Sequence, residues 1–389
     1  MSSTVDVAVV GGGILGLAFA WEAARRGNSV AVFERDHRAQ GASIPNFGMV
    51  WPIGQPAGAL YQLALRSRER WLELSDILWI DRCGSVHAVY EEDEDAVIRE
   101  FAALSPTHGI ACEYVPGRVA ASRLPALRPE GLKGVLWSDT ELAIDPRQAL
   151  VSLPRWLAEQ HRVQFRYGTA VTAVETGRLA TSTGEVCKAA RIFVAAGIDF
   201  QTLFPEAYAT LGLRICKLQM LRTAQQPASW KLGPHLAGEL TPAHYQSFEA
   251  CRSLASVKAR IAAEMLEYLH YGIHVKASQN ELGEVLIGDS HEHDADMSVF
   301  DNPRIDELIL RYLLCMLRLP DATIAARWHG LYAKNPSNSL TVLSPQPGVT
   351  LLATPGGTGM TLSFGFARDW WDARERDPNF APEATRHGP

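Results

Sequence analysis

Three glycines near the start of the chain have the spacing that cradles a dinucleotide. They form Gly11-x-Gly13-x-x-Gly16 and follow an apolar stretch, residues 7–10, that is expected to be a β-strand. In such a motif the first glycine allows a sharp turn, the second lets the backbone approach a pyrophosphate, and the third lets the next helix pack closely on the strand. Glu34 ends a second apolar stretch, where a carboxylate can accept hydrogen bonds from a ribose diol. The pattern predicts a dinucleotide site and leaves NAD and FAD both open.

A second glycine-rich turn lies near the other end of the chain. An apolar strand is expected at residues 349–354, followed by glycines at 356, 357 and 359 and by a helix at 361–374. A strand, a glycine loop and a helix at both ends imply that the chain starts the cofactor domain, leaves it and returns to complete it. A nicotinamide dehydrogenase usually keeps its dinucleotide domain contiguous, so this layout favours FAD over NAD.

The middle of the chain has a different character. Short strands are expected at residues 214–223, 271–278 and 284–289, with helices among them, which is typical of an antiparallel substrate-binding sheet. We therefore predict the α/β class, with a discontinuous Rossmann-like FAD-binding domain and an α+β substrate domain built on an antiparallel sheet. The predicted FAD-binding domain comprises residues 1–80, 145–212 and 326–375, the substrate domain comprises 81–144 and 213–325, and 376–389 form a flexible tail.

The composition narrows the partners and the compartment. The chain has 389 residues, of which 47% are hydrophobic, and its net charge of −6 arises from acidic and basic residues mixed along the sequence. This distribution predicts no nucleic-acid partner. No apolar run approaches the roughly 20 residues that span a bilayer, and no leader peptide is expected before the first strand. Six scattered cysteines without a CxxC motif favour a reduced, cytoplasmic location. A homo-oligomer remains compatible with the sequence.

Across essentially its whole length the chain resembles the FAD-dependent amine and amino-acid oxidoreductases of the D-amino-acid oxidase, glycine oxidase and sarcosine oxidase type. The similar stretches occur in the family's order: Val9-Val-Gly-Gly-Gly-Ile-Leu-Gly16, Glu34-Arg35, Gly41-Ala-Ser43 with Asn46 and Gly48, Thr169-Ala-Val171, Val194-Ala-Ala-Gly197, Trp328-His-Gly-Leu331 and Leu352-Ala-Thr-Pro-Gly-Gly-Thr-Gly359. The resemblance implies a glycine-oxidase-like substrate domain. It also implies oxidation of a small primary or N-methylated amine by hydride transfer to the flavin, giving an imine that hydrolyses to an aldehyde and an amine. Oxygen or an electron carrier would reoxidise the flavin.

Three further stretches resemble one subgroup of this family, which is associated with phosphonate breakdown. They are Cys216-Lys-Leu-Gln-Met220, Tyr271-Gly-Ile-His-Val275 and Ile287-Gly-Asp-Ser-His-Glu292. This resemblance implies an anionic amine of the 2-aminoethylphosphonate type as substrate. The alternative is an oxidase or dehydrogenase of glycine, sarcosine or D-amino acids.

The resemblance also assigns cofactor contacts to particular residues. On the pyrophosphate, ribose, adenine and flavin it places Gly11, Gly13, Ile14, Gly16, Glu34, Arg35, Ser43, Asn46, Phe47, Gly48, Met49, Val171, Ala195, Ala196, Gly197, Gly357, Thr358, Gly359, Met360 and Thr361. None of the cysteines falls where a covalent flavin link is expected, so the FAD is predicted to be non-covalent.

The sequence departs from the family at three positions. Glycine and D-amino-acid oxidases usually carry, after the Gly-Leu pair that follows the tryptophan, an arginine that clamps the substrate carboxylate, whereas here Tyr332 follows Gly330-Leu331. Leu286 stands near the place of a lysine that lies by the flavin in some sarcosine oxidases, which puts a fast reaction with oxygen in doubt. Pro355 replaces a glycine that many relatives have. The first departure argues against an ordinary α-amino acid bound in the usual way.

Candidate substrate-binding residues follow from the chemistry of a phosphonate, which needs several cationic or hydroxyl donors. In a strand over residues 272–278, alternation puts His274 and Lys276 on one face, which is typical of an anion site and equally of a solvated sheet face. His291, and Tyr332 with Lys334 in place of the missing arginine, complete the set. Pairs of histidines at 270/274 and 291/293 suggest a metal, but no third or fourth ligand converges with them, so we predict none. Because the flavin accepts the hydride, no dedicated acid or base is predicted.

Overall fold

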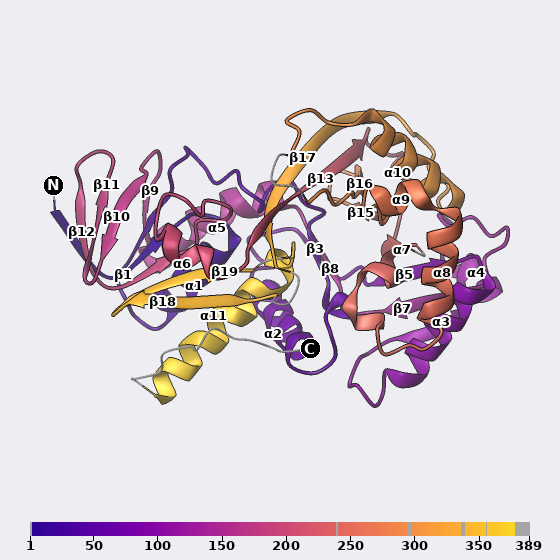
Figure 1. Cartoon of the computed structure of the whole chain (residues 1–389), viewed down its shortest axis with the longest axis horizontal. Coiled ribbons are helices and arrows are strands. Elements are labelled where there is room, and N and C mark those ends of the chain that lie inside the picture. The colour runs from indigo at the N-terminus through magenta and orange to yellow at the C-terminus, as the bar shows by residue number, and fades with distance from the viewer. Residues whose placement is uncertain (1, 239, 294–296, 336–338, 355, 378–389) are drawn as a thin grey trace.

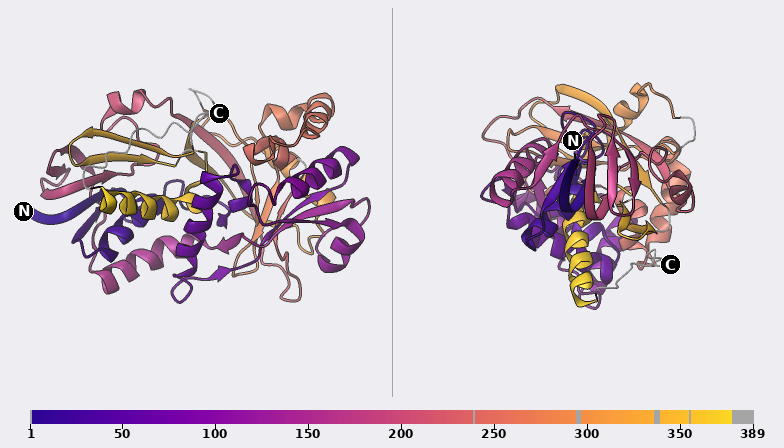
Figure 2. Two further views of the ribbon diagram at one scale, coloured as in Figure 1. Left: turned by 90° about the horizontal axis from the view of Figure 1, so that it is seen from below. Right: turned by 90° about the vertical axis from the view of Figure 1, so that its left-hand side faces the viewer.

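The computed structural model describes residues 2–238, 240–293, 297–335, 339–354 and 356–377. Two lobes lie side by side along the longest axis, with the N-terminal strand at the far end of one lobe and helices α3 (Glu92–Leu104) and α4 (Gly117–Arg123) at the far end of the other (Figures 1 and 2). Each lobe is built around its own eight-stranded sheet. Pro355 and most of the predicted tail, residues 378–389, lie outside the described residues.

The sheet of the first lobe has a core of five parallel strands. The central strands are rich in apolar residues because parallel strands are covered on both faces; Val7, Ala8 and Val9, for example, are fully buried. Strands β10 (Val171–Glu175), β11 (Arg178–Thr181) and β18 (Thr341–Gln346) extend the sheet through antiparallel pairs. The parallel strands, in order across the sheet, are β9 (Gln164–Arg166), β2 (Val30–Phe33), β1 (Ser2–Val10), β12 (Val186–Val194) and β19 (Val349–Ala353).

Segments far apart in the sequence complete this lobe. Helices α1 (Ile14–Arg25), α2 (Ala59–Leu72), α5 (Pro146–His161) and α11 (Gly359–Arg376) share one hydrophobic core with the sheet, and α6 (Pro205–Ala209) packs on the core of the other face. Helix α11 packs against α2 at Gly365, where a Cβ atom would lie 2.3 Å from the carbonyl oxygen of Leu63. Strand β19 and helix α11 therefore return to the lobe that β1 and α1 began, as the two glycine-rich turns predicted.

The second lobe contains a mixed, mainly antiparallel sheet. Its order is β17-β13-β16-β15-β14-β5-β7-β6, and β14 with β5 is its parallel pair. Helices α8 (Leu254–Glu264), α9 (Leu266–His270) and α10 (Pro303–Met316) lie beside it, with α3 and α4 (Figure 1). The strands are β17 (Ile324–Lys334), β13 (Arg214–Thr223), β16 (Val285–Gly288), β15 (Lys276–Gln279), β14 (His235–Ala237), β5 (Ser85–Val89), β7 (Gly134–Ser138) and β6 (Glu113–Pro116).

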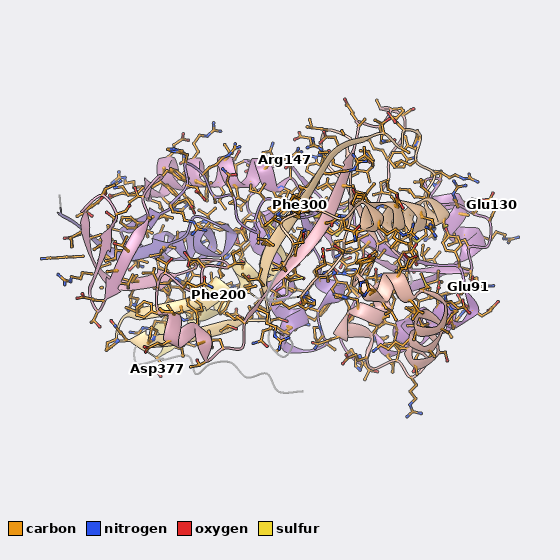
Figure 3. The ribbon with its side chains drawn as sticks, turned by 45° about the horizontal axis from the view of Figure 1, so that its top comes forward. Glu91, Glu130, Arg147, Phe200, Phe300 and Asp377 are labelled. Atoms are coloured by element: carbon orange, nitrogen blue, oxygen red, sulfur yellow. The ribbon has the colours of Figure 1, made fainter. Side chains whose placement is uncertain are left out.

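The two lobes are joined by a small sheet and by polar contacts. Strands β3 (Met49–Val50), β8 (Leu142–Ile144) and β4 (Ile80–Asp81) form a three-stranded antiparallel sheet between them. Arg147, in the first turn of α5 and labelled in Figure 3, pairs with Asp145 at 2.7 Å and reaches Glu284 of the second lobe at 3.3 Å. No helix among the described residues is long and apolar enough to cross a membrane.

The structure differs from the sequence-based expectations at two element boundaries. The strand expected over residues 271–278 begins only at Lys276, although His274 still exchanges both backbone hydrogen bonds with Asp289. The domain boundary expected at residue 326 falls inside β17, which pairs with β13 along its whole length and so belongs to the second sheet. A long strand that crosses from one lobe to the other cannot be divided by composition alone.

Candidate functional site

A continuous cavity of about 430 Å³ runs between the two lobes. One end lies at the carboxyl ends of β1 and β2, where open α/β sheets bind ligands. The other end reaches the second sheet at β15, the segment after β16, and β17. The cavity therefore brings together the two regions that carry the predicted cofactor and substrate residues.

The glycine motif forms one wall of the cavity. Gly11 has φ +104°, and a Cβ atom there would lie 2.3 Å from the carbonyl oxygen of Ala195; at Gly16 it would lie 2.0 Å from the carbonyl oxygen of Gly11. Gly13 is different, because its Cβ would meet only the Ser43 hydroxyl, at 3.1 Å, and would otherwise project into open space. The first and third glycines are thus required by the fold, and the second keeps space free for a ligand.

The N-terminus of α1 points at this space. Gly13 is its N-cap and supplies no side-chain cap, and the N–H of Ile14 donates to the hydroxyl of Ser43 at 2.9 Å. Unpaired N–H groups and the helix dipole make such a terminus a site for phosphate groups. The glycine cradle, the open helix end and the adjacent hydroxyl fit a pyrophosphate.

Glu34 lies at the end of β2 with its carboxylate at the cavity wall. Its oxygens accept hydrogen bonds from the N–H groups of Gly12, at 2.8 Å, and Asp36, at 3.0 Å. Each carboxylate oxygen has a second lone pair, so the group can still accept hydrogen bonds from a ribose. Arg35 beside it pairs with Asp199 at 3.0 Å. This arrangement fits the adenosine end of FAD.

Most of the predicted cofactor residues line the cavity. Those that do are Gly11, Gly13, Ile14, Gly16, Glu34, Arg35, Ser43, Asn46, Phe47, Val171, Ala195, Ala196, Gly197, Gly357, Gly359 and Met360. Gly48, Met49, Thr358 and Thr361 lie outside its wall. Gly48 has φ +71° and packs on the carbonyl of Ile144, and the hydroxyl of Thr361 accepts a hydrogen bond from the Trp51 N–H at 3.0 Å. These two residues hold the backbone around the cofactor region.

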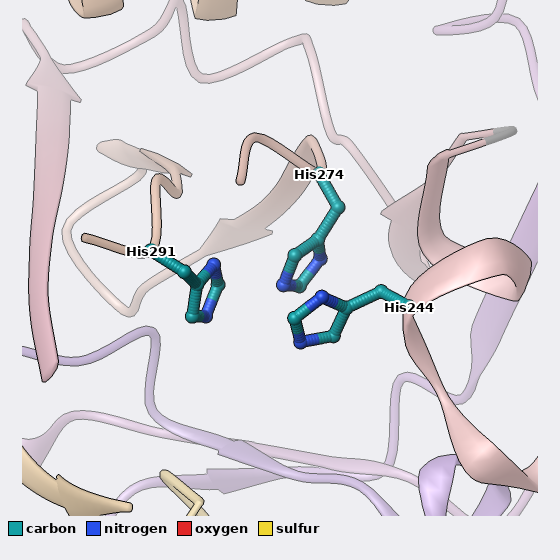
Figure 4. Close-up of side chains that lie close together, drawn as sticks. All are labelled: His244, His274 and His291. Carbon is teal, nitrogen blue, oxygen red and sulfur yellow. The ribbon is translucent and has the colours of Figure 1, made fainter. Parts of the chain in front are cut away.

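Three imidazole rings gather at the other end of the cavity. His274 precedes β15, His291 follows β16, and His244 ends helix α7 (Leu240–His244) (Figure 4). The centroid of the His274 ring lies 4.0 Å from that of His244 and 4.6 Å from that of His291. Burial keeps the pKa of His274 and His291 well below the ordinary value, so these two rings are neutral at neutral pH, whereas His244 is exposed at the edge of the cluster.

Lys276 and Asp289 lie beside this histidine cluster. The ammonium of Lys276 donates to the hydroxyl of Tyr245 at 3.0 Å and lies 4.6 Å from the ring centroid of Phe47. Burial opposes its charge, but Asp289 and Tyr245 outweigh burial and raise its pKa. Burial raises the pKa of Asp289 to about 6, although Lys276 acts in the opposite direction. His274 and Lys276 are almost fully buried, which excludes the solvated sheet face as an explanation for their alternation.

Two residues of β17 were predicted to replace the missing arginine. Tyr332 lines the cavity, and burial together with Cys216 on the neighbouring strand raises its pKa well above the ordinary value, so its hydroxyl stays protonated. Lys334 lies outside the cavity wall, where its ammonium donates to Nε2 of His293 at 3.2 Å. Of the five predicted substrate residues, therefore, four line the cavity and Lys334 stands behind it.

The histidine cluster corrects one premise of the sequence-based expectation that no metal is bound. That expectation relied on the lack of a third ligand, yet His244 brings a third ring, and the ring nitrogens lie within 4.8 Å of one another. Imidazole lone pairs lie in the plane of the ring. The planes of His244 and His274 differ by 27° and those of His274 and His291 by 16°, so the stacked rings do not aim their lone pairs at one point. We assign no metal to the cluster.

Three residues of this site were not singled out from the sequence. His244 ends a short helix and Tyr245 follows it, in a segment without a recognisable motif, and Asp289 lies inside the stretch Gly288-Asp-Ser-His. The sequence does mark Asp289, because it is an acidic residue directly after a buried strand, preceded by Gly288 and followed two residues later by His291. For His244 and Tyr245 the sequence holds no such signal.

Comparisons with known proteins agree with this geometry. The family model described as "FAD dependent oxidoreductase" (DAO) matches residues 6–370. A subunit of the opine oxidase of Rhizobium meliloti is 28% identical over 237 residues, which cover 56% of this chain and 63% of that protein. Glycine oxidase of Geobacillus kaustophilus (strain HTA426) is 25% identical over 210 residues, covering 51% of this chain and 55% of that protein. The chain thus aligns with less than two thirds of the length of these curated relatives.

The fold is also found in solved structures. The structure of glycine oxidase from Geobacillus kaustophilus superposes with a TM-score of 0.76 at 19% identity and covers 99% of both chains. The predicted fold class is confirmed. The chain belongs to the DAO family of FAD-dependent oxidoreductases, and the residues of its glycine cradle fit that cofactor.

Proposed function

We propose that this chain oxidises a small primary or N-methylated amine that carries a phosphonate group. FAD, when bound, supplies the acceptor for a hydride from the carbon that bears the nitrogen. The nitrogen lone pair forms the imine as this hydride leaves, and water then converts the imine to an aldehyde and a free amine. The protein's part is to hold the amine with its C–H bond toward the flavin and to bind the anion at the far end.

The donor set at the substrate end of the cavity is the observation that favours a phosphonate. Among the described residues that line the cavity, the single arginine is Arg35, at the dinucleotide end. The substrate end instead offers the ammonium of Lys276, the hydroxyls of Tyr245 and Tyr332, and the imidazoles of His244 and His274. A carboxylate is matched best by the planar fork of an arginine, whereas the three oxygens of a phosphonate suit several point donors from different directions.

Glycine, sarcosine or a D-amino acid is the second candidate, because glycine oxidase is among the relatives of this chain. The two candidates differ in the anion and share the amine. An anaerobic comparison of 2-aminoethylphosphonate and its N-methyl derivative with glycine, sarcosine and D-alanine separates them, with bleaching of the flavin absorbance as the signal. We expect the phosphonates to bleach the flavin at least tenfold more efficiently. Bleaching by the amino acids alone would refute the phosphonate proposal.

The same comparison in a Lys276→Met variant tests the anion site directly. We expect the KM for 2-aminoethylphosphonate to rise at least tenfold while the protein keeps its FAD, because the ammonium binds a group remote from the reacting carbon. Lys258→Met, in the exposed part of α8, is the matched control and should leave the KM unchanged. Admitting air after reduction distinguishes oxygen from an electron carrier as the final acceptor.

A further inference from the structure

We infer that Asp289 accepts the proton that the substrate ammonium must lose before its carbon can be oxidised. This inference rests on the proposed function only in that the substrate is an amine. The step is R–CH2–NH3⁺ plus the Asp289 carboxylate, giving R–CH2–NH2 plus the Asp289 carboxylic acid. The N–H bond breaks, the proton forms an O–H bond on Asp289, and the nitrogen keeps the electron pair that later forms the imine.

The position of Asp289 in the cavity is the first argument. Four acidic residues line the described cavity wall, and Glu34, Asp36 and Asp199 stand at the dinucleotide end. Asp289 is the carboxylate of the substrate end, and it directly follows Gly288, the last residue of β16. An ammonium that enters this end therefore meets one carboxylate among the described lining residues, and the neighbouring side chains cannot replace it as an anionic partner.

The hydrogen bonding of Asp289 is the second argument. Its side chain is buried, and Oδ1 has no hydrogen-bond partner. The nearest ring nitrogens are Nε2 of His274, 3.4 Å from Oδ1, and Nε2 of His291, 3.8 Å from Oδ2, both beyond a good hydrogen bond. A buried carboxylate oxygen without a donor is costly, so this atom is poised for a group that brings a proton.

His291 presents an acceptor nitrogen 3.8 Å from the carboxyl group that takes up the proton. Its Nδ1 lies 3.0 Å from the carbonyl oxygen of Gly272, an acceptor, so Nδ1 carries the hydrogen and Nε2 carries a lone pair. That lone pair faces Asp289. A protonated Asp289 can therefore donate to His291, while an ionised Asp289 cannot receive a hydrogen bond from it.

The charges around Asp289 keep its carboxyl group ionised near neutral pH, as proton transfer from the substrate ammonium requires. Burial raises its pKa and Lys276 acts in the opposite direction, so the carboxyl is ionised above about pH 6. The ionisable groups that surround it are the other side chains of the substrate end: Lys276 from β15 and His274 just before it, His291 from its own segment, His244 from α7 and Tyr245 just after it, Cys216 from β13, and Tyr332 and Lys334 from β17.

The test follows the pH dependence of anaerobic flavin bleaching in wild type and in Asp289→Asn. An alkylammonium with a pKa near that of lysine, about 10.4, is less than about 1% neutral at pH 8. Wild type should keep a constant efficiency from about pH 7 to 9 and lose it below about pH 6, as Asp289 becomes protonated. The bleaching efficiency of Asp289→Asn should be about 100-fold lower than that of wild type at pH 8. It should then rise tenfold for each pH unit up to the pKa of the amine. Asp289→Glu should restore the plateau.

A second readout does not depend on turnover. An amine without hydrogen on the nitrogen-bearing carbon binds and is not oxidised: 2-amino-2-methylpropylphosphonate for the phosphonates, or 2-aminoisobutyrate for amino acids. Calorimetry at pH 8 in two buffers of different ionisation enthalpy counts the protons that pass to the buffer when this amine binds. Wild type should release close to none, because the proton stays between the bound amine and Asp289, and Asp289→Asn should release close to one. Asp301→Asn, an exposed carboxylate outside the cavity wall, is the matched control.

The comparison of phosphonates with amino acids decides which amine is used in these two experiments. If the phosphonates do not bleach the flavin and D-alanine does, the pH profiles are measured with D-alanine and the proton counts with 2-aminoisobutyrate. The phosphonate proposal and the Asp289 proposal can therefore fail separately. Parallel pH profiles for wild type and Asp289→Asn, or equal proton counts, would assign Asp289 a purely structural role. If no amine bleaches the flavin, both proposals fall.

Discussion

At the scale of single residues, the three glycines of the cradle, Gly11, Gly13 and Gly16, are needed for different reasons. Gly11 and Gly16 face carbonyl oxygens at distances that no Cβ atom could tolerate, so the fold itself needs them. Gly13 has an ordinary φ of −71° and faces mostly open space. The motif therefore contains two glycines that fold the turn and one that leaves room for the cofactor.

This difference predicts opposite outcomes for two similar substitutions. Gly13→Ala should weaken FAD binding at least tenfold and change the melting temperature of the apoprotein by less than about 2 °C, because the new methyl group occupies the pyrophosphate space. Gly11→Ala should lower the apoprotein melting temperature clearly, because φ +104° and the Ala195 carbonyl both oppose a side chain. FAD titration and thermal unfolding measure the two effects. Equal melting temperatures for the two variants would contradict this assignment.

At the scale of elements, the close packing of α11 against α2 holds the last segment of the chain in the first lobe. Gly365 of α11 lies against the backbone of α2, with space for hydrogen only. This approach places the start of α11, Gly359 and Met360, on the cavity wall. Packing in the N-terminal half of α11 thus positions the glycine turn at the start of the helix.

A side chain at the helix contact should therefore destabilise the protein. Gly365→Ala places a Cβ atom 2.3 Å from the Leu63 carbonyl oxygen, and we expect it to cost about 1–3 kcal/mol, the usual range for overpacking. Urea unfolding measures this loss. Arg376→Ala, at the exposed end of the same helix, should stay within about 0.5 kcal/mol of wild type. A neutral Gly365→Ala variant would show that the two helices can move apart at no cost.

At the scale of the whole molecule, the site exists only where the two lobes meet. The first lobe supplies the glycine cradle and Glu34, and the second supplies the histidine cluster, Lys276 and Asp289. Arg147 and Glu284 add a polar contact across the boundary. A cofactor that fills the cavity between the lobes would add contacts to both.

Bound FAD should accordingly stabilise the native protein as a unit. A ligand that binds only the folded state at 1,000 times its Kd contributes about 4 kcal/mol. We expect the melting temperature to fall when FAD is removed and to return when FAD is added, in one cooperative transition. Differential scanning calorimetry of the holoprotein and apoprotein tests this. An unchanged melting temperature would mean that the cavity is not the FAD site.

Much of the cofactor side of the site could be predicted from the sequence. A strand, a glycine turn, a helix and an acid follow one another within residues 7–34, so their geometry is set by local backbone conformation. The return of the chain at residues 349–374 was predicted for the same reason. The alternation that singled out His274 and Lys276 is likewise a local property of extended backbone.

The substrate end was decided by the tertiary structure. His244 and Tyr245, at the end of a short helix, and Asp289, after a strand, are separated in the sequence, and only tertiary contacts such as the stacking of His244 on His274 and the hydrogen bond from Lys276 to Tyr245 bring them together. The pairing of β17 with β13, which also joins distant segments, leaves Lys334 outside the cavity wall. The sequence determined the cradle because neighbouring residues build it, whereas the substrate end depends on long-range burial, which also sets the charge of each group.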